Sequence, residues 1–304
     1  EQAVTIAERL DSDQVIAPLH LACGRTHHRR EQHDDAIPLL ISAAERAAKS
    51  GQQDVQIISL LLLSFSLAVA ERIDESEKRF AEVIELCRRV GDDFHMAAAL
   101  LNRELLWIKR NDLDRAIEDA RGVVSLARLM GNAQLERWAT GNMAEFYYWS
   151  GSFERAHKLA SHARDLHLRF SAKYPGHGEH LLLARIACSR GDLDAKTYVQ
   201  WLESHCDCDN LPPVDKTLLH TVKLSIKTLE HRQLDRAPWV ELADQASEQA
   251  LHDVHREISL LASELASHME LAAEAGFWTA RARAAIGEAR IWEPRLAAVE
   301  RALR

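Results

Sequence analysis

The stretches AERAAKSG (44–51), IELCRRVG (84–91) and VSLARLMG (124–131) each end on a glycine after a run of helix-forming residues. These glycines, Gly51, Gly91 and Gly131, stand 40 residues apart. Asn102 and Asn142 are separated by the same interval. A series of small residues follows it too, with spacings of 40, 40, 40, 39 and 42 along Ala36, Ser76, Ala116, Ala156, Ala195 and Ala237. Three separate landmarks with one period identify a repeat array.

Each repeat carries the pattern of two helices. From Leu113 onward, apolar residues recur three and four positions apart, as on the buried face of a helix. Short polar turns such as 110–112 and 150–152 separate the helices, and the glycines suit C-terminal caps. One helix pair cannot bury both of its faces, so neighbouring pairs must stack. We predict an all-α chain with more than roughly 70% helix and no sheet. After a short helix near 2–10, about seven antiparallel pairs are expected, at 14–51, 53–91, 94–131, 134–172, 178–208, 214–251 and 254–304.

Composition excludes several classes of protein. The 304 residues include only 12 Gly and 7 Pro, too few for the many turns of a β sandwich or barrel. The net charge of −8 disfavours a surface that contacts nucleic acid. The longest uncharged run, Ile57–Ala70, is shorter than the ~20 residues of a spanning helix, so no membrane contact is expected. Five cysteines indicate no disulfide framework and favour the cytoplasm. Because the chain begins at Glu1 without a methionine, we expect a fragment of a larger protein.

The turn motif resembles that of the tetratricopeptide repeat family in its longer form of about 40 residues. Gly151-Ser152-Phe153-Glu154-Arg155-Ala156 fits the family pattern fully, and 111–116 fits except that Asn replaces Gly. The resemblance implies a right-handed superhelical solenoid over 1–304. Bends are expected near 173–178 and 210–213, because proline and glycine interrupt the helical pattern there. The first helix of each pair would then line a concave groove. The long form is similar to the C-terminal arrays of MalT-type transcription activators and of multidomain bacterial kinases and nucleotide cyclases.

Residues with metal-binding or catalytic chemistry are present but poorly spaced for it. The segment His205-Cys206-Asp207-Cys208-Asp209 contains zinc-type ligands, yet no second cysteine pair completes a structural site. The segment His177-Gly178-Glu179-His180 lacks the spacing that puts two histidines and a glutamate on one helix face. Phosphate-binding and nucleophile motifs are absent from the sequence. We therefore expect no metal, no cofactor and no enzymatic activity.

The groove-facing positions implied by the resemblance are the candidate binding site. They comprise Asn102, Asn142, Glu145, Tyr148, Arg185 and Lys223. Asparagine both donates and accepts hydrogen bonds, which suits a grip on an extended peptide backbone; alternatively, Asn102 and Asn142 bridge helices inside the stack. We expect a non-catalytic interaction or sensing module of a larger signalling protein, whose partner is a protein, a peptide or an adjacent domain. The alternative is a small-ligand-sensing regulatory domain of an NTPase-type transcription activator.

Overall fold

The computed structural model describes residues 12–170 and 176–303, and helix accounts for 85% of them. No strand occurs in these two ranges, so the all-α prediction is confirmed. None of the helices there is long and apolar enough to cross a membrane. The helix expected near 2–10 and part of the break expected at 173–178 lie outside the described residues.

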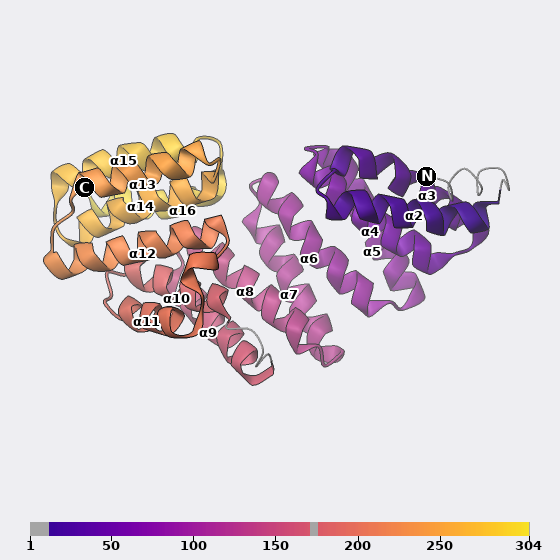
Figure 1. The fold of residues 1–304 in the computed structure, drawn as a ribbon, viewed down its shortest axis with the longest axis horizontal. Helices are drawn as coiled ribbons and strands as arrows, with labels where there is room; N and C mark the ends of the chain where they lie inside the picture. Colours follow the sequence, from indigo (N-terminus) through magenta and orange to yellow (C-terminus); the bar gives the residue numbers. More distant parts are fainter. Residues whose placement is uncertain (1–11, 171–175, 304) are drawn as a thin grey trace. The chain divides into compact units, whose positions relative to one another are not determined.

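The helices follow one another in packed pairs that match the predicted boundaries to within a few residues. The chain divides into two compact units, with the boundary between Ala139 and Thr140 inside α8. The units are described separately below, and Figure 1 gives their helix labels. The bounds are α2 Asp13–Arg29, α3 His33–Ser50, α4 Gln53–Val69, α5 Ile73–Val90, α6 Asp93–Lys109, α7 Leu113–Leu129, α8 Ala133–Trp149, α9 Phe153–Phe170, α10 His177–Ser189, α11 Ala195–His205, α12 Pro213–His231, α13 Arg236–Glu248, α14 His252–His268, α15 Ala272–Ile286 and α16 Glu293–Ala302.

The first unit shows why the sequence landmarks repeat. Gly51, Gly91 and Gly131 adopt φ values of 72°, 75° and 64° at the ends of α3, α5 and α7, a backbone conformation that favours glycine. The residue after each glycine donates its backbone N–H to a carbonyl five positions earlier, which closes the helix end. Ala36 and Ala116 are fully buried near the starts of α3 and α7. These positions are small because the helices pack closely there.

The second unit departs from a stack in which each pair meets only its neighbours. Its helix α14 packs against α10, α12 and α16 as well as α15. The residues of the C-terminal helix α16 were expected in the seventh pair, 254–304. In the structure, α16 reaches back to the turn between α8 and α9. There the Trp149 and Trp292 rings lie 5.6 Å apart, and a Cβ built on Gly151 would stand 3.3 Å from Arg295 Cα. The last helices of this unit therefore close onto its first.

The glycine turns offer a test of this closure. Gly131 and Gly151 both have positive φ, so alanine strains the backbone at either position by about 1 kcal/mol. A Cβ at Gly131 meets no atom within 4 Å, whereas at Gly151 it meets the α16 backbone. We expect Gly151→Ala to lower the free energy of unfolding measurably more than Gly131→Ala, as measured by urea denaturation. Equal losses would contradict the packing of α16 on this turn.

Candidate functional site

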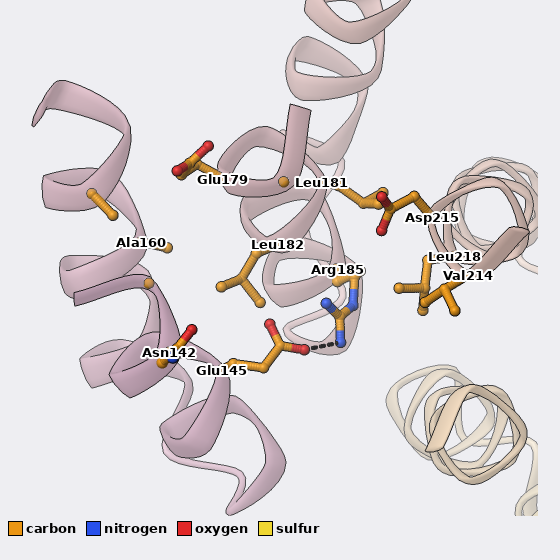
Figure 2. Close-up of a pocket in the computed structure, with 13 residues that line it drawn as sticks. Asn142, Glu145, Ala160, Glu179, Leu181, Leu182, Arg185, Val214, Asp215 and Leu218 are labelled. Atoms are coloured by element: carbon orange, nitrogen blue, oxygen red, sulfur yellow. Dashed lines mark hydrogen bonds and ion pairs between the residues drawn. The ribbon is translucent and has the colours of Figure 1, made fainter. Parts of the chain in front are cut away.

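A cavity of about 340 Å³ opens in the second unit, on the side where α8, α10 and α12 lie next to one another. These are the first helices of three successive pairs, the elements that the tetratricopeptide resemblance places around a groove. Figure 2 shows the walls, to which α9 also contributes. The lining residues are Gly141, Asn142, Glu145, Ala160, Ala163, Gly178, Glu179, Leu181, Leu182, Arg185, Val214, Asp215 and Leu218.

One ion pair crosses the floor of the cavity. Arg185 Nη2 on α10 donates to Glu145 Oε1 on α8 at 2.6 Å, and Figure 2 marks this bond. The Glu145 side chain keeps a quarter of its surface exposed, whereas Arg185 is almost fully buried. Burial raises the pKa of the Glu145 carboxyl, against the lowering effect of Arg185. The cavity therefore presents a partly desolvated carboxylate whose nearest cation is already shared.

That cation is shared because Arg185 also pairs with α14. Its Nε and Nη2 donate to Glu257 Oε1 and Oε2 at 2.7 and 2.5 Å, a bidentate pair. Glu257 exposes only 2% of its surface. Nearby carboxylates hold the pKa of the Arg185 guanidinium well above its ordinary value, although burial opposes them. Arg185 is thus a permanent cation whose donors facing α14 are occupied.

Tyr148 lies at the centre of this buried charge cluster. Its hydroxyl donates to Glu257 Oε1 at 2.8 Å. The guanidinium carbons of Arg185 and Arg295 lie 4.8 and 4.4 Å from the centre of its ring. Arg295 on α16 is in turn bidentate to Glu264 on α14, with both distances 2.7 Å. Burial raises the pKa of the Tyr148 hydroxyl, so it stays protonated and donates.

The predicted binding residues differ in whether they line the cavity. Asn142, Glu145 and Arg185 line the cavity. Tyr148 is fully buried, which corrects the expectation that it faces a groove: its ring contacts two buried arginines instead. Arg185 lines the cavity and pairs there with carboxylates of its own chain, so its role as a donor to a ligand stays a prediction.

Lys223 and Asn102 lie elsewhere. Lys223 on α12 is exposed, pairs with Glu203 at 2.7 Å, and is not among the lining residues. Asn102 is half-buried on α6 of the first unit. A binding role for either residue stays a prediction.

Sequence reasoning missed the acidic partners of the cluster. Glu257 and Glu264 are seven residues apart on α14, so they lie on one face of the helix, and every residue from 257 to 266 is buried. A carboxylate on an apolar helix face is a signal for a buried cation elsewhere in the chain. The sequence around Asp215 and Glu179 did not indicate that these two residues line the cavity.

The two segments considered for metal binding have local structural contacts. His180 is buried, its Nδ1 bonds to the Gly176 carbonyl at 3.2 Å, and its ring stacks on Trp201 at 3.5 Å. Burial raises the pKa values of the Cys206 and Cys208 thiols, which keeps them protonated. Across residues 12–170 and 176–303, no group of three His, Cys, Asp or Glu side chains is placed to hold a metal ion.

Comparisons with known proteins give a structural relationship and no sequence relationship. No family model matches the chain, and no curated protein matches it by sequence. Among solved structures, aspartyl phosphate phosphatase F from Bacillus subtilis is similar, with a TM-score of 0.71 and 10% identity. The similarity covers 90% of this chain and 71% of that one. The chain therefore has a helical-repeat fold of the tetratricopeptide type.

The burial of Arg185 leads to a stability prediction. Arg185→Met leaves the Glu257 carboxylate buried without its main cation, which costs about 3–5 kcal/mol of unfolding free energy. Lys223→Met is the control, because that exposed pair is worth about 0–1 kcal/mol. Urea denaturation measures both. Adding Glu257→Gln to Arg185→Met removes the unpaired charge and recovers part of the loss. Similar effects for Arg185→Met and Lys223→Met would contradict the structure.

Two histidines are expected to change the stability of the fold in opposite directions of pH. His177 Nε2 lies 3.1 Å from Asp215 Oδ2, and this hydrogen bond raises the His177 pKa. The pair therefore stabilises the fold fully below the unfolded pKa of about 6.5, and this contribution is lost as pH rises through the higher folded pKa. Burial, His33 and Arg29 lower the pKa of His28, so its contribution is present above about 6.5 and is lost as pH falls. Denaturation between about pH 5.5 and 8.5 measures the free energy of unfolding. His177→Asn should remove the fall in this free energy as pH rises, and His28→Asn should remove the fall as pH decreases. Unchanged pH profiles would contradict both assignments.

Proposed function

We propose that this chain is a non-catalytic binding module whose cavity on α8, α10 and α12 holds a segment of a protein partner or a peptide. One observation carries the proposal: Asn142, Glu145 and Arg185, each at the groove position of its repeat, line the same cavity. At about 340 Å³, the cavity falls within the ~300–1,000 Å³ range of ligand pockets. It suits a short stretch of chain inserted from a larger partner.

The walls combine the two kinds of contact that peptide recognition uses. Leu181, Leu182 and Leu218 provide apolar surface from α10 and α12. Asn142 provides an amide group that can both donate to and accept from a peptide backbone. Gly141 and Gly178 leave open space beside the helices, since a Cβ on either would meet no atom within 4 Å. A peptide backbone can therefore approach the helix surface closely.

A regulatory role in a larger cytoplasmic signalling protein accords with the resemblance to the arrays of bacterial signalling proteins. The structurally similar phosphatase is named for aspartyl phosphate, a modified protein side chain, and this supports a protein as the partner class here. The proposal carries over the binding of a protein and no phosphatase chemistry.

Filling the cavity tests the proposal. Gly141→Trp directs an indole into the open space beside α8, and Gly276→Trp, at an exposed helical glycine of α15 with equally open surroundings, is the control. Heptapeptides selected from a random displayed library on the unmodified chain should lose at least about tenfold in affinity, or 1.4 kcal/mol, only with Gly141→Trp. Failure to select any peptide that Gly141→Trp excludes would contradict peptide binding in this cavity.

A further inference from the structure

Helix α16 carries a charge into the interior of the second unit. Arg295 exposes 1% of its surface, and its Nε and Nη2 donate to the Glu264 carboxylate on α14, both at 2.7 Å. Nη2 also donates to Ser189 Oγ on α10 at 2.9 Å. A partial shift of α16 would leave both charges buried without each other, which is costly, whereas complete release lets water reach both. This ion pair therefore favours a docked or a fully released α16 over any intermediate position.

Docked α16 leaves two buried donors unsatisfied. Trp292 Nε1, in the turn that precedes the helix, and Arg295 Nη1 have no hydrogen-bond partner among the described residues. A buried N–H group without a partner loses the hydrogen bond that water would give it, so each of these donors opposes docking. Release of α16 would return both donors to water.

The seat of α16 is also incompletely filled. A second cavity, of about 400 Å³, lies along the helix and is lined there by Ala298, Val299 and Ala302. Phe153 on α9 and Ser267 on α14 belong to its other walls. Protein interiors are close-packed, so an open space along a docked helix removes contacts that would hold the helix in place.

The connection to α15 allows α16 to leave without unwinding its neighbour. Residues 287–289 and the 3-10 turn 290–292 join the two helices. Rotation within this linker moves α16 while the backbone hydrogen bonds of α15 stay intact. The contacts that break are those to α14 and to the α8–α9 turn, where Gly151 lies against Arg295.

We propose that α16 is a switch helix, which leaves its seat as one unit while the rest of the second unit stays folded. Release uncovers the Tyr148 ring, which lies 4.4 Å from the Arg295 guanidinium, and the Trp149 ring, 5.6 Å from that of Trp292. The second unit then has a closed form and an open form, and the open form presents an aromatic surface at the α8–α9 turn. Release does not depend on what the cavity on α8, α10 and α12 binds.

Labelling of a buried thiol in the full chain measures the release. Val299→Cys places a thiol on the docked face of α16, where the valine exposes 5% of its surface. Val199→Cys is the matched control, because that valine is 7% exposed on α11, a helix of 11 residues against 10 in α16. Each rate with iodoacetamide is divided by that of the same variant unfolded in urea, and mass spectrometry separates the new thiol from the five native cysteines.

A local opening requires less free energy and exposes less surface than global unfolding. We therefore expect the Val299→Cys thiol to be labelled at least about 30-fold faster than the Val199→Cys thiol. Low concentrations of urea should change the rate for Val299→Cys little and accelerate the rate for Val199→Cys steeply.

Filling the space along α16 tests the cause of the release. Ala298→Leu extends an apolar side chain into the cavity and, combined with Val299→Cys, should slow labelling by at least about fivefold. Arg301→Leu, at an exposed position of the same helix outside the lining, is the control and should leave the rate unchanged. Hydrogen exchange of the unmodified chain is a second measurement, in which the α16 amides should exchange through an opening that α14 does not share.

Three results would overturn the proposal. Equal normalised rates for Val299→Cys and Val199→Cys, with the same steep dependence on urea, would mean that α16 leaves only when the whole unit unfolds. Equal effects of Ala298→Leu and Arg301→Leu would mean that the cavity does not weaken docking. If the amides of α16 and α14 exchange through one common opening in the unmodified chain, fast labelling reflects damage by Val299→Cys and α16 is no switch.

Discussion

Two buried arginines, both in contact with the Tyr148 ring, set the constraint on which the second unit depends. Placing Arg185 and Arg295 in the interior is costly unless each meets a carboxylate in good geometry, and α14 supplies both, Glu257 and Glu264. Four helices, α8, α10, α14 and α16, must therefore reach their positions together. Apolar packing alone would tolerate small shifts between these helices, whereas paired buried charges fix one arrangement. The cluster thus explains why this part of the chain closes instead of continuing as an open stack.

This closure also gives the cavity its rigidity. Arg185 forms part of the cavity floor, and its guanidinium is held from the α14 side by two bonds to Glu257. Glu145, bonded to the same guanidinium, is oriented in turn. A binding site whose side chains are already held in place loses less conformational entropy when it binds a ligand. Under the proposed function, the cluster therefore holds the lining side chains in place, and Tyr148, which does not itself line the cavity, acts as a buried positioning residue.

The period of the array could be predicted from sequence because its causes are local. A glycine at a helix end and a small residue where helices touch, such as Gly91 and Ala116, recur wherever the same pair is built. The groove positions of Asn142 and Glu145 were expected from the resemblance of the turn motif, and both residues line the cavity. The partners of Arg185 did not, because Glu257 lies 72 residues further along the chain, outside any repeat interval. At a groove position, an arginine free for a ligand and one bound by its own chain look identical in sequence.

The charge that the cavity presents follows from that distant pairing. Glu257 does not line the cavity, yet it neutralises the one lining cation. With an apolar residue at position 257, the Arg185 guanidinium would keep only Glu145, and the cavity would gain a partly unpaired positive charge at its floor. A buried carboxylate on α14 therefore has two effects: it fastens the closing helices to α10, and it neutralises the cation that α10 contributes to the cavity lining.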